Sequence, residues 1–154
     1  MAKRAKTRYH EAGHVLAAHY FGVRTEYVDR GFKEKGAERG TSGLTQYVVE
    51  DCETLGRLEQ VAISFAGDIA ERKYSGVEPL SSGGDFERVL YFVYDLPEAE
   101  AMKVIEEGYV LAAKIIEQDW GTIEKLADLF MENQVTEAPL EKLGLVHESR
   151  YISK

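Results

Sequence analysis

Apolar residues at helical spacing are the feature of this sequence that most constrains its fold. In the segment 53–74 they recur every three or four positions, at Leu55, Leu58, Val61, Ala62, Phe65, Ile69 and Ala70. This spacing gathers them on one face of an α-helix, which another element must cover. Similar patterns predict further helices over 3–21, from 85 onward, over 97–118 and over 121–132, with a short last helix over 136–143.

Two segments near the N-terminus predict β-strands instead. Residues 24–29 have a strand-like composition, and residues 43–49 alternate apolar and polar side chains before a β-branched pair. The charged, glycine-rich segment 31–42 between them predicts a loop. Strands this close in sequence usually pair antiparallel. The sequence therefore predicts a mainly α fold with a small antiparallel β-hairpin or sheet near the N-terminus.

Length and composition favour one globular domain over residues 1–154, with loose tails at 1–6 and 145–154. The net charge of −8 argues against a nucleic-acid partner, because the one basic cluster is the short run 3–8. The apolar run 15–18 is too short to span a membrane. The single cysteine, Cys52, allows no intramolecular disulfide or thiolate cluster. These features predict a cytoplasmic protein with no membrane span.

The stretch YHEAGH at 9–14 predicts a metal site on the first helix. His10 and His14 are four residues apart, so a helix projects both from one face. Two such histidines typically bind zinc, while the glutamate after the first one, here Glu11, acts as general base. The alternative is an ordinary helix whose histidines form hydrogen bonds. The pair Ala12 and Gly13 favours the site, because glycine is costly inside a helix and predicts close packing against another helix.

A catalytic zinc site needs a third protein ligand and an open position. His19 lies five residues after His14, which turns it away from the pair on the same helix. His147 falls in the expected C-terminal tail. Two carboxylates remain, Glu71 and Asp85. Asp85 is also explained as a helix cap, and Glu71 as an ion-pair partner or a partner for a histidine N–H. The residues alone leave the third ligand open between these two.

Several motifs carry a resemblance to a known family. They are YHEAGH, GLT at 43–45, ISFAGDIAERKYSG at 63–76 and SSGGDFERV at 81–89. From about 7 to 143, the chain resembles the peptidase domain of the FtsH-type ATP-dependent zinc proteases. The resemblance implies the zincin fold of that domain and Zn²⁺ as cofactor. It implies His10, His14 and Asp85 as the zinc ligands, Glu11 as general base, and a supporting place near the site for Glu71.

The sequence departs from that family in two respects. It has no Gly-x-x-x-x-Gly-Lys-Ser/Thr phosphate loop, so no ATP site is expected. The segment after Asp85, FERVLYFVYDL, is more aromatic than the family's helix, which leaves the oligomeric state open. The expected protein is a stand-alone zinc peptidase that does not use ATP.

The expected activity is hydrolysis of peptide bonds in unfolded or flexible protein segments, which makes the chain a zinc metalloendopeptidase. A substrate would add itself as a further strand along the edge formed by Leu44, Thr45, Gln46, Tyr47 and Val48. The alternative is a non-catalytic zinc-binding domain that acts as a protein-interaction or regulatory module. The intact general base, Glu11, favours the enzyme.

Overall fold

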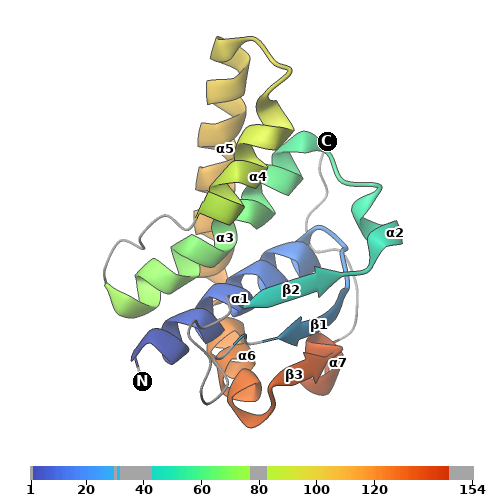
Figure 1. Ribbon diagram of the computed structural model, residues 1–154, viewed down its shortest axis with the longest axis vertical. Helices are drawn as coiled ribbons and strands as arrows, with labels where there is room; N and C mark the ends of the chain where they lie inside the picture. Colours follow the sequence, from blue (N-terminus) through green and yellow to red (C-terminus); the bar gives the residue numbers. More distant parts are fainter. Residues whose placement is uncertain (1, 30, 32–42, 77–82, 146–154) are drawn as a thin grey trace.

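The computed structural model describes residues 2–29, 31, 43–76 and 83–145 (Figure 1). The elements are, in chain order, α1 (Ala2–Tyr20), β1 (Thr25–Asp29), β2 (Leu44–Tyr47), α2 (Val49–Cys52), α3 (Arg57–Ser75), α4 (Gly83–Val93), α5 (Glu98–Gln118), α6 (Trp120–Glu132), β3 (Val135–Glu137) and α7 (Pro139–Lys142). The prediction of a mainly α fold with a small antiparallel sheet is confirmed.

Close helix packing around α1 forms the centre of the molecule. Figure 1 shows α1 running between α3 and the small sheet. A Cβ atom on Gly13 would lie 2.4 Å from the carbonyl oxygen of Ala66 and 2.8 Å from the Cβ atom of Ala70 on α3. Ala12 is fully buried beside it. The close packing predicted from the Ala-Gly pair is therefore confirmed.

The remaining helices extend this core on both sides. On α5, a Cβ atom at Gly108 would lie 2.5 Å from Val61 Cγ1, so α5 approaches α3 closely. On the other side, α6 packs against α1 and contributes fully buried side chains, among them Ile123, Leu126 and Phe130. Most of the apolar positions predicted at helical spacing thus meet in one core, while Val61 packs with Val89 and Val93 in a second, smaller cluster.

The bounds of α3 follow from its two flanking glycines. The N–H of Gly56 donates to Glu59 Oε1 at 3.0 Å, which caps the start of the helix. Gly76 takes a left-handed conformation at φ 72°, which ends it. The helix predicted over 53–74 therefore begins later than expected, at Arg57. A separate short helix, α2, precedes it over residues 49–52.

The sheet has the strand order β2-β1-β3, with antiparallel pairing throughout. The predicted pairing of the first two strands is confirmed, and Val28 pairs with Thr45 on one side and Thr136 on the other. The prediction of a helix over 136–143 is wrong in its first part, because 135–137 form β3. Ala138, at φ 43°, turns the chain out of the strand, and Pro139 then opens α7.

The predicted tails differ from the structure where it describes them. Residues 2–6 belong to α1, and Ala5 is buried, so the expectation of a loose segment over 1–6 is wrong for these positions. Leu145 packs against the core. Residues 146–154, with His147, lie outside the described residues, as do 32–42 of the expected loop. Among the described helices, none combines the length and apolar character that a membrane span requires.

Candidate metal centre

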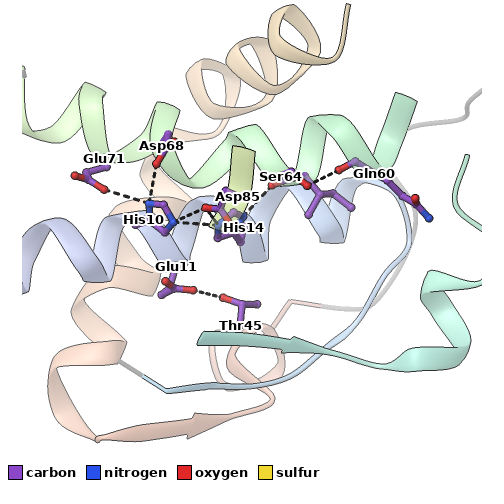
Figure 2. A network of polar contacts seen from close by, with 10 residues as sticks. His10, Glu11, His14, Thr45, Gln60, Ser64, Asp68, Glu71 and Asp85 are labelled. Atoms are coloured by element: carbon purple, nitrogen blue, oxygen red, sulfur yellow. Dashed lines mark hydrogen bonds and ion pairs between the residues drawn. The ribbon is translucent and has the colours of Figure 1, made fainter. Parts of the chain in front are cut away.

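Three side chains from two helices converge on one point (Figure 2). His10 and His14 project from α1, and Asp85 comes from the first turn of α4. Asp85 Oδ2 lies 2.8 Å from His10 Nε2 and 3.1 Å from His14 Nε2. The two Nε2 atoms are 3.2 Å apart. The pair predicted from four-residue spacing therefore shares one carboxylate oxygen.

This triangle of donor atoms fits a divalent metal ion such as zinc. Zinc bonds of about 2.0–2.1 Å in tetrahedral geometry separate neighbouring ligand atoms by about 3.3 Å, close to the spacing of these three atoms. Two imidazoles and a carboxylate also suit other transition metals. On α3, a Cβ atom at Gly67 would lie 2.4 Å from His14 Nε2 and 2.7 Å from His10 Nε2. Only glycine leaves this side of the site open.

The opposite nitrogens of the two imidazoles meet acceptors on α3. His14 Nδ1 lies 2.8 Å from the carbonyl oxygen of Ile63, and His10 Nδ1 lies 3.1 Å from Glu71 Oε1. Ile63, Gly67 and Glu71 follow one another at four-residue intervals, so a single ridge of α3 faces both histidines. Acceptors at Nδ1 keep the proton on that nitrogen and direct the Nε2 lone pairs towards the site.

The geometry separates the two carboxylates that the sequence left open. Asp85 contacts the Nε2 atoms of both histidines, whereas Glu71 contacts only the Nδ1 atom of His10. The interpretation of Glu71 as a partner for a histidine N–H matches this contact. His19 is buried, and it does not belong to the group formed by His10, His14 and Asp85.

The electrostatics of the site favour positive charge at the imidazoles. Burial lowers the pKa of His10, but the hydrogen bonds with Asp85 and Glu71 outweigh it and raise the pKa to about 10. Burial also opposes the charged form of His14, and the carboxylate of Asp85 raises its pKa nonetheless. For Asp85, burial raises the pKa, but His14 and His10 together hold it well below its ordinary value. The carboxylates here stabilise a cation.

Glu11 points from α1 towards the sheet (Figure 2). Its side chain is 4% exposed, and Thr45 Oγ1 on β2 donates a hydrogen bond to Glu11 Oε1 at 2.7 Å. A Cβ atom at Gly43 would lie 2.6 Å from Glu11 Oε2, so the backbone before β2 also adjoins this carboxylate. The predicted general base therefore lies between the histidine pair and the predicted substrate strand.

The predicted substrate strand is shorter than expected. Leu44, Thr45, Gln46 and Tyr47 form β2, while Val48 lies beyond its end. The N–H of Val48 still donates to the carbonyl oxygen of Arg24 at 2.9 Å, but Val49 begins α2. The carbonyl oxygen of Val48 accepts from the N–H groups of Asp51 at 3.1 Å and Cys52 at 3.4 Å, so it belongs to the first turn of α2 and not to a strand. Within the described residues, β2 is an outer strand and its second edge is unpaired.

Three contributors to this site were not predicted from the sequence. Asp68 Oδ1 lies 3.4 Å from His10 Nδ1, and its position one turn before Glu71 on α3 was a usable signal. Asp68 and Glu71 form, together with His10, a second cluster of possible metal ligands. Acidic clusters of this kind are common in proteins without a bound metal. Gly67 also carried a signal, because a glycine inside a helix often marks close approach. The sequence carries no signal for the Ile63 carbonyl, because every residue type has a backbone carbonyl.

A comparison with protein-family models finds no match for this chain, and a comparison with curated proteins finds none either. The resemblance to FtsH-type peptidase domains therefore remains a prediction that rests on the sequence motifs.

Proposed function

We propose that this protein is a zinc metalloendopeptidase whose domain resembles the FtsH-type peptidase domain. The observation that carries the proposal is the convergence of His10 Nε2, His14 Nε2 and Asp85 Oδ2 within 3.2 Å of one another. Glu11 follows His10 directly and lies on the sheet side of this group. Two imidazoles, a third ligand and a neighbouring carboxylate are the parts that zinc-dependent hydrolysis requires.

In this proposal, His10, His14 and Asp85 hold the zinc ion, while Glu71 and the Ile63 carbonyl fix the orientation of the imidazoles. When bound, zinc supplies a Lewis acid that polarises the scissile carbonyl and lowers the pKa of a water molecule to about 7.

Glu11 performs the proton transfers of the reaction. It takes one proton from water while the water oxygen bonds to the carbonyl carbon of the substrate. Glu11 then delivers this proton to the leaving nitrogen as the carbon–nitrogen bond breaks. The products are a carboxylic acid, which keeps the second proton of water, and an amine; the acid then passes that proton to the amine, and Glu11 is again ionised.

The open edge of β2 supports the proposed substrate class. An extended peptide can pair with the open edge of β2 through main-chain hydrogen bonds, which requires an unfolded or flexible segment. Folded proteins would not present such a segment, and nothing in the proposed reaction uses ATP.

The free thiol of Cys52, the single cysteine, favours a reducing compartment such as the cytoplasm for this activity.

Substitution of the base tests the proposal. Glu11→Gln is expected to lower the rate of casein cleavage by about 10²–10⁴-fold, because it removes the general base. Metal analysis should find one zinc per chain in both proteins. Glu117→Gln is the control, since Glu117 is an exposed α5 residue paired with Lys73. Gently purified protein without metal, or a Glu11→Gln protein as active as wild type, would contradict the proposal.

A non-catalytic zinc-binding interaction module is the second candidate. The observation that favours it is the burial of Glu11, which is 4% exposed and hydrogen-bonded to Thr45, because a buried carboxylate has little access to water. A module of this kind would capture an extended peptide on β2 in one-to-one stoichiometry and release it unchanged. Mass spectrometry of the peptide after incubation distinguishes the two functions, because the enzyme produces fragments and the module does not.

A further inference from the structure

We propose that Thr45 is a positioning residue, which couples the substrate strand β2 to the general base Glu11. This inference rests on the proposed peptidase function and adds to it a residue that neither the motif nor the metal site identifies. It gives β2 a second role, since the strand that would bind substrate also orients the group that activates water.

The contact itself fixes the orientation of the carboxylate. The Thr45 hydroxyl donates to Glu11 Oε1 at 2.7 Å, which occupies one of the two carboxylate oxygens. The other oxygen, Oε2, is left to accept the proton of water. Gly43 lies beside this second oxygen, and only glycine leaves room for it, because an added Cβ atom there would lie 2.6 Å from Oε2 and 2.8 Å from Glu11 Cγ. One oxygen of Glu11 therefore accepts a hydrogen bond from Thr45, and the other lies beside the backbone of Gly43.

The position of Thr45 in the sheet provides the coupling. Thr45 pairs with Val28 of the neighbouring strand, and its side chain points to α1 (Figure 2). An extended substrate on the open edge of β2 would bond to the main chain of 44–47 and order the strand that carries this hydroxyl. Substrate binding and orientation of the base are therefore linked through one residue.

Such a link predicts a specific kinetic signature. A residue that orients the base acts on the chemical step, so its loss lowers kcat and leaves KM nearly unchanged. A residue that only stabilises β2 as a docking edge would raise KM instead.

The test compares zinc-loaded Thr45→Val, which keeps the shape of the side chain but removes the donor, with Thr45→Ser, which keeps the hydroxyl. Thr45→Val is expected to lower kcat roughly 10-fold, the size of one hydrogen bond to a charged group, with KM within about twofold of wild type. Thr45→Ser should recover most of this loss. Both proteins should retain wild-type zinc content.

Thr136→Val is the matched control. Thr136 lies in the same row of the sheet, opposite Val28 on β3, and it is 1% exposed. Within the described part of the chain its hydroxyl has no hydrogen-bond partner. The same substitution there should leave kcat and KM unchanged.

A second readout does not depend on activity. Melting temperatures of the zinc-loaded wild type, Thr45→Val, Glu11→Ala and the double variant form a cycle in which each single substitution removes the contact, and the contact predicts non-additive shifts. If Thr45→Val does not fold, Gly43→Ala tests the same orientation from the other side, again with a lower kcat expected.

The outcomes separate this inference from the proposed function. A wild-type protein that cleaves nothing contradicts the peptidase and this inference with it. An active wild type with a fully active Thr45→Val, a raised KM at unchanged kcat, or strictly additive melting shifts overturns only the role of Thr45.

Discussion

Asp85 and Glu71 approach His10 from opposite nitrogens of the ring. Asp85 Oδ2 is 2.8 Å from Nε2, and Glu71 Oε1 is 3.1 Å from Nδ1. A carboxylate at Nε2 can bind the metal directly, whereas a carboxylate at Nδ1 holds the proton and the ring orientation. The two acidic residues are therefore expected to contribute to metal affinity by different amounts.

Zinc affinity measures this difference. Glu71→Gln is expected to weaken zinc binding by about 10–100-fold, the usual cost of losing a partner of a ligand. Asp85→Asn should weaken it further, because the substitution removes the anionic ligand itself. Competition with a chromogenic chelator gives both values, with Glu117→Gln as the exposed control. A larger loss for Glu71→Gln than for Asp85→Asn would contradict the assignment.

At the scale of elements, the contact between α1 and α3 sets the geometry of the site. Both histidines lie on α1, and their Nδ1 partners and the open side at Gly67 lie on α3. The distance between these helices therefore controls whether the imidazoles reach their acceptors. Gly13 makes the approach possible, because any side chain there would meet the α3 backbone at Ala66.

Gly13→Ala tests this contact. The added Cβ atom would lie 2.4 Å from the Ala66 carbonyl oxygen, so the two helices must separate. Such overpacking is expected to lower the free energy of unfolding by about 1–3 kcal/mol, measured by urea denaturation. Gly121→Ala on α6 is the control, since its Cβ atom would have nothing within 4 Å. Equal stability of Gly13→Ala and wild type would show that the helices tolerate a wider spacing.

At the scale of the whole molecule, the site joins α4 to the rest of the fold. Apart from Asp85, α4 is held by a small cluster in which Val89 and Val93 pack on Val61 of α3. The larger core involves α1, α3, α5 and α6. A metal ion held by Asp85 and both histidines would add a further link between α4 and α1.

Metal addition and removal should therefore change the stability of α4 more than that of α5 and α6. Zinc at about 100 times its dissociation constant is expected to stabilise the protein by about 2.7 kcal/mol, seen as a higher melting temperature. Hydrogen exchange should slow mainly in α4 and much less in α5 and α6. Chelation should reverse both effects, and Asp85→Asn should show neither. An unchanged melting temperature with zinc in excess would rule out this link.

The features that depend on local spacing could be predicted from the amino-acid sequence. Helical periodicity predicted α1, α3, α5 and α6, while strand-like composition predicted β1 and alternation predicted β2. The four-residue interval predicted that His10 and His14 share a face. These signals are reliable because neighbours on one helix or strand are positioned by backbone geometry alone.

The contacts between residues far apart in the sequence became known from the three-dimensional structure. Asp85 is 75 residues from His10, and Thr45 is 34 residues from Glu11, so their contacts depend on how whole elements pack. The same holds for β3, because a helix was predicted from 136 onward, but residues 135–137 pair with β1. A strand is stabilised by the strand beside it, and that partner is chosen by the fold, not by the segment's own residues.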